Sequence, residues 1–165
     1  QDASADRPGY EARTLVPTNV IPLCSPSYME KQGPIDTIDA LLSCTLIDDN
    51  THLWRRWTEG LGCHDERVAK ARPFSDLGPA VTSATLGEGV VLAPKVLVDH
   101  HLRLGALVAM DWFGTSEVSR HYYLFWKSTN LRQNVEIVRD WLGQTADQLE
   151  PDAAVKPPRT ARIRV

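Results

Sequence analysis

Two short runs of this 165-residue chain combine side chains that could do chemistry. Cys63, His64 and Asp65 offer a thiol, an imidazole and a carboxylate. Neighbouring residues of one loop rarely converge on a metal ion, and no second cluster at ligand spacing accompanies them. Asp48 and Asp49 could form a carboxylate pair for acid–base work. Adjacent side chains of an extended segment point to opposite faces, so capping of the following helix is the better interpretation.

Other signatures of catalysis and cofactor binding are missing from the sequence. The run Gly87-Glu88-Gly89 lies between a predicted helix and a predicted strand, the reverse of a phosphate-binding loop. Three cysteines in no Cys-x-x-Cys pattern support neither a disulfide framework nor a zinc ribbon, and fit a reducing cytoplasm. His100 and His101 fall at the end of a predicted helix, where imidazolium suits the helix dipole. We therefore expect no enzymatic activity, no cofactor and no metal site.

Hydrophobic periodicity predicts an alternation of strands and helices along the chain. Short connections between them favour the α/β class, with a largely parallel sheet and right-handed crossovers. Ligands of such sheets bind beyond the carboxyl ends of strands, which directs attention to the loops 48–53, 74–77 and 93–95. The predicted strands are 20–24, 45–47, 71–74, 90–93, 107–110 and 122–126, and the predicted helices are 38–42, 53–61, 77–86, 95–104 and 131–149.

The charge is unevenly distributed. Residues 151–165 contain four basic residues, one acid and three prolines, which predicts a disordered basic tail. The rest of the chain carries a net charge of −6, which argues against nucleic-acid binding by the folded part. No apolar run approaches the ~20 residues of a membrane span, and no secretory leader precedes the first strand. The start at Gln1, without methionine, leads us to expect a processed, truncated or excerpted chain.

A series of short motifs resembles the effector-binding domain of LysR-type transcriptional regulators. The series runs in order over about residues 15–145, with the strongest likeness to the subgroup of glycine-cleavage and β-lactamase activators. Each motif alone is weak, but their order is specific. The motifs are the Pro-x-Cys-Ser-Pro-x-Tyr run at 22–28, the Leu-Leu-x-x-x-Leu-Ile run within 40–47, the Trp-x-x-Trp pair at 54–57, Phe-x-Asp at 74–76, Gly-x-Gly-Val-x-Leu-Ala-Pro at 87–94, a Leu- and Gly-containing segment at 97–108, and a Tyr-Tyr-Leu strand with its helix at 122–142.

The resemblance implies the architecture of type 2 periplasmic binding proteins, in which two α/β subdomains enclose an effector in a cleft. Residues 1–21 would then be a leader and crossover strand, and 22–128 the second subdomain. Residues 129–149 would be a helix returning to the first subdomain, followed by the tail at 150–165. The family's DNA-binding domain and the first half of the first subdomain would precede residue 1, so the first subdomain would be incomplete in this chain.

The same resemblance implies that the protein senses a small polar effector and performs no catalysis. The full-length protein would be a homodimer or tetramer in the cytoplasm, without membrane contact, and would bind DNA only through its N-terminal domain. The residues expected at the cleft are Thr51, His52, Leu53, Ser75, Asp76, Leu77 and Tyr122. Helix capping is the alternative role for Ser75 and Asp76, and packing in the core is the better interpretation of Trp54 and Trp57.

Two other functions stay open at this point. The chain could be half of a solute-binding protein that serves a transporter, or a degenerate module that binds no ligand. Under the resemblance to LysR-type regulators, the apolar face of the last helix, with Val135, Val138 and Leu142, would belong against a sheet that is mostly missing. We therefore expect that face to be exposed.

Overall fold

The structure is a computed structural model that describes residues 8–113, 120–129 and 131–148. These residues form two compact units. One contains residues 19–113, and the other joins residues 8–18 to 120–129 and 131–148. The tail predicted at 150–165 lies outside the described residues.

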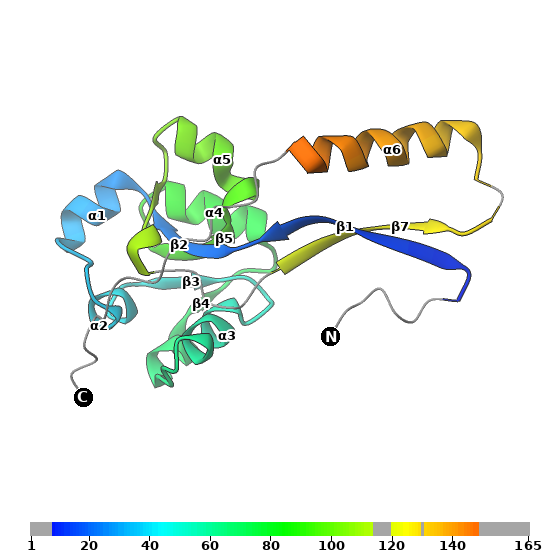
Figure 1. The fold of residues 1–165 in the computed structure, drawn as a ribbon. Helices are drawn as coiled ribbons and strands as arrows, with labels where there is room; N and C mark the ends of the chain where they lie inside the picture. The colour runs from blue at the N-terminus through cyan, green and yellow to red at the C-terminus, as the bar shows by residue number, and fades with distance from the viewer. Residues whose placement is uncertain (1–7, 114–119, 130, 149–165) are drawn as a thin grey trace. The chain divides into compact units, whose positions relative to one another are not determined.

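A five-stranded sheet, in the order β4-β3-β5-β2-β6, forms the centre of the larger unit (Figure 1). β3 is parallel to both β4 and β5, whereas β2 is antiparallel to both β5 and β6. The α/β class is confirmed, and the sheet is mixed because β2 opposes its neighbours. An apolar run buried on both faces predicts a central strand but not its direction. The strands are β2 (Val20–Cys24), β3 (Leu46–Asp48), β4 (Arg72–Pro73), β5 (Val90–Pro94) and β6 (Val108–Ala109).

Helices cover both faces of this sheet, with α2 and α3 on one side and α4 and α5 on the other (Figure 1). Successive strand residues point to opposite faces and so supply two apolar layers. Leu46 and Val90 pack in the layer of Trp54 and Trp57, whereas Ile47 joins the layer of α4. The helices are α1 (Pro26–Gln32), α2 (Ile38–Leu42), α3 (Leu53–Gly60), α4 (Leu77–Thr85) and α5 (Lys95–Arg103), with 3₁₀ turns η1 (Glu66–Lys70) and η2 (Asp111–Phe113).

The sequence predicts no helix at residues 26–32, because Ser25-Pro26 is typical of the end of a strand. The hydroxyl of Ser25 instead accepts a hydrogen bond from the Tyr28 N–H at 3.2 Å and caps α1. Pro26 occupies the first turn, where a missing N–H costs nothing. The same two residues thus end β2 and start α1.

The smaller unit consists of a two-stranded sheet and one helix. β1 (Tyr10–Thr18) pairs antiparallel with β7 (Arg120–Lys127), and α6 (Gln133–Gln148) packs on β1. Arg13 donates to the Asp147 carboxylate at 2.6 Å and so ties β1 to the end of α6. β7 therefore belongs to this unit. The boundaries predicted at 22 and 128 stay a prediction, although the compact units divide at 18/19 and 118/119.

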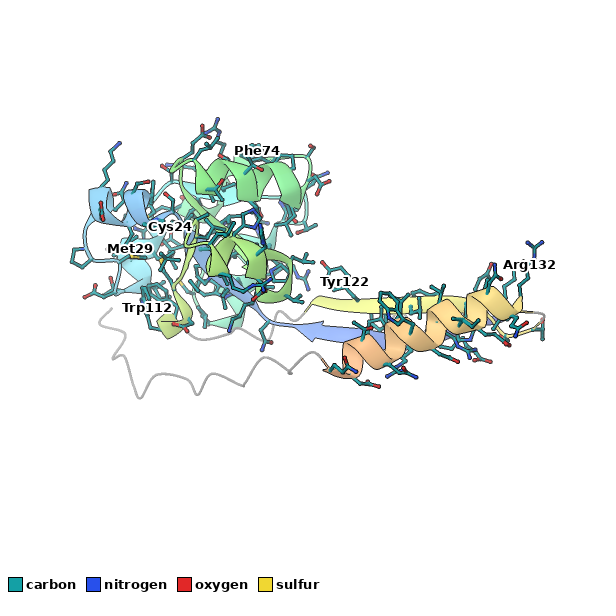
Figure 2. All side chains as sticks on the ribbon, turned by 90° about the horizontal axis from the view of Figure 1, so that it is seen from above. Cys24, Met29, Phe74, Trp112, Tyr122 and Arg132 are labelled. Carbon is teal, nitrogen blue, oxygen red and sulfur yellow. The ribbon has the colours of Figure 1, made fainter. Side chains whose placement is uncertain are left out.

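Of the face expected to be exposed on α6, Val135 and Val138 are exposed, whereas Leu142 is half-buried. Val135 and Val138 are 42% and 54% exposed, and Ile137 and Trp141 exceed 60%. In Figure 2 side chains project outward along the whole helix. No helix among the described residues has the length and apolarity to span a membrane.

Candidate functional site

Two loops leave the five-stranded sheet at the same edge. Residues 49–52 follow β3, and residues 74–76 follow β4. β3 and β4 are parallel with Asp48 opposite Pro73, so both chains turn at the carboxyl ends of their strands. The Phe74 N–H donates to the carbonyl of Asp48 at 2.8 Å and joins the two turns. The six expected residues at 51–53 and 75–77 are thus brought to one edge.

Asp48 and Asp49 shape the first loop. The Asp48 carboxylate is buried and accepts the Leu53 N–H at 3.2 Å, which caps the start of α3. The Asp49 carboxylate accepts the Thr51 N–H at 3.1 Å and the Thr51 hydroxyl. Burial raises the pKa of Asp48 above the usual aspartate value, although the Leu53 N–H opposes this. Asp48 thus caps α3 as expected, whereas Asp49 holds the turn at Thr51, which precedes the helix.

His52 has an unusual backbone. With φ of 52° and ψ of 42° it is left-handed, and among the described residues it is the only non-glycine with positive φ. Such a conformation costs free energy and persists only where neighbouring contacts enforce it. Asp48 and Asp49 supply those contacts on either side of the turn. The His52 imidazole is exposed, whereas Leu53 is buried in the core.

The second loop leads into α4. Asp76 is the N-cap of α4, and its carboxylate accepts the Gly78 N–H at 3.3 Å. Ser75 is exposed, and its hydroxyl has no hydrogen-bond partner among the described residues. Leu77 is half-buried against the layer that contains α4 and α5. Capping therefore accounts for Asp76, while Ser75 keeps a free hydroxyl beside the helix terminus.

Tyr122 belongs to the smaller unit, on β7, whereas the two loops belong to the larger one (Figure 2). It is 37% exposed and pairs with Val16 in the β1–β7 register. Its place in a common site with the loop residues stays a prediction.

The remaining candidate clusters have structural roles. Asp65 caps η1 and binds the Arg67 guanidinium at 2.7 Å, which holds its pKa down at about 2. Burial raises the pKa of Cys24 to about 11, helped by Cys44. Within the described ranges, no three His, Cys, Asp or Glu side chains are grouped to hold a metal ion.

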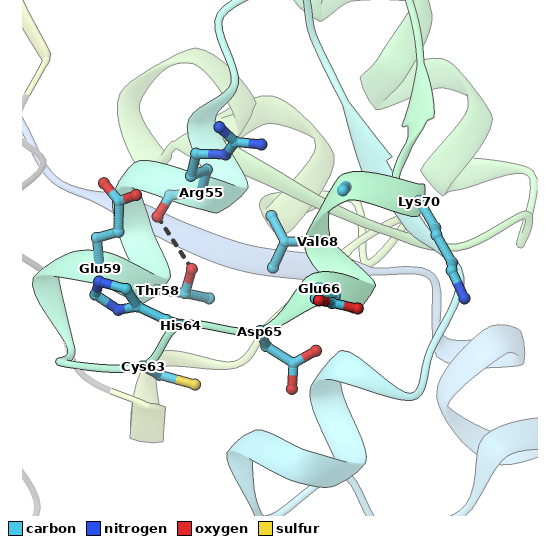
Figure 3. A pocket seen from close by; sticks show the side chains of 10 residues that line it. Arg55, Thr58, Glu59, Cys63, His64, Asp65, Glu66, Val68 and Lys70 are labelled. Carbon is cyan, nitrogen blue, oxygen red and sulfur yellow. Dashed lines mark hydrogen bonds between the residues drawn. The ribbon is translucent and has the colours of Figure 1, made fainter.

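A hollow that sequence reasoning missed lies between α3 and η1 (Figure 3). It has a volume of about 720 Å³ and is lined in part by charged side chains of both signs. The sequence offers one signal for this hollow, the opposite charges four residues apart at Arg55/Glu59 and Glu66/Lys70. The same spacing is also common on solvated helix faces. The charged lining side chains are Arg55, Glu59, Asp65, Glu66 and Lys70, with His64 beside them.

Comparison with known proteins finds a family match over most of the chain. The model of the LysR substrate binding domain matches residues 2–147. The glycine cleavage system transcriptional activator of Escherichia coli is 29% identical over 102 residues, which are 61% of this chain and 33% of that protein. The HTH-type transcriptional regulator PerR of Escherichia coli is 28% identical over 144 residues, covering 81% of this chain and 45% of that protein. The chain thus spans less than half the length of these relatives.

Solved effector domains share its fold. The effector domain of AmpR from Pseudomonas aeruginosa superposes with a TM-score of 0.69 at 24% identity, over 87% of this chain and 68% of that one. The regulatory domain of CrgA from Neisseria meningitidis gives 0.67 at 19% identity, over 86% and 71%. Both belong to the type 2 periplasmic-binding-protein-like architecture expected above.

Proposed function

The chain belongs to the LysR substrate-binding domain family, and from that premise we propose that it is the effector-sensing part of a bacterial transcriptional regulator. Its matched relatives are regulators and not enzymes. The ligand would be a small polar molecule, held at the edge where the loops after β3 and β4 meet. The observation that carries this proposal is the convergence of two loops with exposed hydroxyl and imidazole groups, in a chain of this family.

The chemistry of that edge supports a polar ligand over an apolar one. Ser75 offers an exposed hydroxyl, His52 an exposed imidazole, and the start of α4 a positive dipole end. Such groups orient a ligand by hydrogen bonds, and few of them suffice in a binding site. Tyr122 would contribute from the smaller unit, and binding would shift the protein between two arrangements.

The partners follow from the family. We infer that the whole protein binds DNA through a separate domain, because 18 basic residues against 21 acids give this chain no surplus for phosphate contacts. It would act as a homodimer or tetramer in the cytoplasm, where its DNA is. The solute-binding and degenerate-module alternatives are not favoured, since the matched relatives are regulators.

Thermal unfolding in the presence of individual amino acids, hydroxy acids and sugars tests the proposal. A true effector at 100 times its Kd adds about 2.7 kcal/mol of stability, which should raise Tm by roughly 5–10 °C in a chain of this size. Ser75→Ala should lose most of that shift. Ser128→Ala, an exposed serine far along the sequence on the other unit, should keep it. If the ligand raised the Tm of both variants equally, Ser75 and its loop would not be part of the binding site.

A further inference from the structure

The hollow between α3 and η1 has walls that are fixed by hydrogen bonds. The Cys63 N–H donates to the Thr58 carbonyl at 2.8 Å, which closes the turn after α3. The Thr58 hydroxyl donates to the Arg55 carbonyl at 3.0 Å (Figure 3). Val68 of η1 is buried in the core, so it packs η1 against the layer that contains Trp54 and Trp57. These contacts hold the backbone on both sides of the hollow, while most of its charged lining side chains are exposed to solvent.

One ion-pair network holds the outer side of η1. Arg67 binds Asp65 at 2.7 Å and Asp39 of α2 at 2.8 Å, and it also donates to the Ser43 hydroxyl at 2.9 Å. All three guanidinium nitrogens of Arg67 donate hydrogen bonds, and the Asp65 carboxylate accepts several of them. The wall formed by η1 is therefore fastened to α2 on one side and faces α3 with the other.

The charged side chains that face the hollow do not form ion pairs such as those of Arg67. Arg55 and Glu59 stand four residues apart on α3, and Glu66 and Lys70 four residues apart on η1. Within the part of the chain that the structure describes, none of these four side chains makes an ion pair or a hydrogen bond. Two cations and two anions thus surround one cavity without neutralising each other.

The lining narrows the class of ligand. A metal ion is disfavoured, because the described residues contain no group of three suitable ligands. A polyanion is disfavoured because the two acids would repel it. A volume of about 720 Å³ lies within the usual range for small-molecule sites, roughly 300–1,000 Å³. A molecule that carries both an ammonium and a carboxylate group satisfies both signs of charge at once.

We propose that the hollow between α3 and η1 is a second binding site, which takes a zwitterion of amino-acid or dipeptide size. Arg55 and Lys70 bind its carboxylate groups, and Glu59 and Glu66 bind its ammonium groups. Charge-assisted hydrogen bonds of this kind are the stronger ones in proteins. This site shares no residue with the loops at 51–53 and 75–77, and it does not depend on the proposed function.

Amide chemical shifts of the ¹⁵N-labelled chain test this site, with glycylglycine and lysylglutamate as probes. At least one probe should cause saturable shifts that centre on residues 55–70. N-acetylglycine and glycinamide, which each carry one charge, should bind at least about tenfold more weakly, because each lacks one charge-assisted contact. Arg55→Gln and Lys70→Gln should each weaken binding by a similar factor. Arg56→Gln, on the same helix but outside the lining, should leave it unchanged.

Three results would overturn the proposal. The first is the absence of saturable shifts with both zwitterions. The second is a set of shifts confined to residues 51–53 and 75–77, which would place the ligand at the candidate effector loops instead. The third is equal binding of the singly charged analogues, which would mean that paired charges do not select the ligand.

Discussion

Asp48 is a buried carboxylate at the carboxyl end of β3, and its titration should be visible in the stability of the chain. Burial raises its pKa in the folded state, so the folded protein binds a proton more readily than the unfolded chain. Its contribution to stability is therefore greatest at acidic pH and falls as the pH rises through the folded-state value. At neutral pH the buried charge costs free energy.

Replacing Asp48 with asparagine should therefore stabilise the protein at pH 7. The amide oxygen still accepts the Leu53 N–H, while the buried charge disappears. The gain over the wild type should shrink as the pH falls toward 4, as measured by urea unfolding across this range. Asp48→Ala, which also lacks the acceptor, should be less stable than Asp48→Asn at every pH. A gain that does not vary with pH would show that charge burial is not its cause.

The three cysteines should differ in reactivity. Cys24 is fully buried with a pKa raised to about 11, so about one thousandth of it is thiolate at pH 8. Cys63 is partly exposed at the rim of the hollow. In a time course of iodoacetamide labelling followed by mass spectrometry, Cys63 should react first and Cys24 last. Early labelling of Cys24 in the folded chain would contradict the burial of β2.

Gly89 is required where the chain entering β5 passes close to the start of β3. A Cβ at this position would collide with the Thr45 carbonyl oxygen, which also accepts the Val90 N–H at 2.8 Å. Gly89→Ala should therefore destabilise the chain by about 1–3 kcal/mol in urea unfolding. Gly78→Ala is the matched control. It meets no atom within 4 Å in α4, so it should stabilise by about 0.5–1 kcal/mol. Equal effects of the two substitutions would mean that space at Gly89 is not limiting.

At the scale of elements, the pattern of apolar residues predicts the core strands well. The runs at 20–24 and 90–93 are confirmed as β2 and β5, because a strand buried on both faces leaves an unbroken apolar signature. The pairing of β1 with β7 could not be predicted, since Glu11 and Trp126 meet across 115 positions of sequence.

For the site, the edge position of Ser75 follows from strand order, whereas the left-handed turn at His52 depends on contacts of Asp48 and Asp49 that no local pattern encodes.

Helix α6 is expected to be the least protected long element. Its side-chain contacts to β1 and β7 include the ion pair of Arg13 with Asp147 and the guanidinium of Arg139 over the ring of Trp126 at 5.6 Å. Exposed ion pairs contribute little, and most of its apolar side chains face solvent. Amide hydrogen exchange should therefore be faster over residues 135–142 than over β5. Strong protection of residues 135–142 in a monomer would contradict this expectation.

At the scale of the whole molecule, the two apolar layers belong entirely to the larger unit. Every residue of both layers falls between Val20 and Phe113, and none comes from β1, β7 or α6. Buried apolar area is the main source of folding free energy, at about 25 cal/mol per Å². The smaller unit has no such layer among its described residues, where Gly143 is the only buried position on α6. The stability of the chain should thus reside in residues 19–118.

A truncated chain of residues 19–118 should therefore fold by itself. Circular dichroism should show a cooperative thermal transition with a Tm within a few degrees of that of the full chain. Trp54 and Trp57, which are both fully buried, provide a second probe through their fluorescence. The complementary test is Trp57→Ala in the full chain, which removes a large side chain from the layer beside α3 and should cost about 3–5 kcal/mol. If the truncated chain were unfolded while the full chain melted cooperatively, β1, β7 and α6 would have to supply stability that their exposed surfaces do not account for.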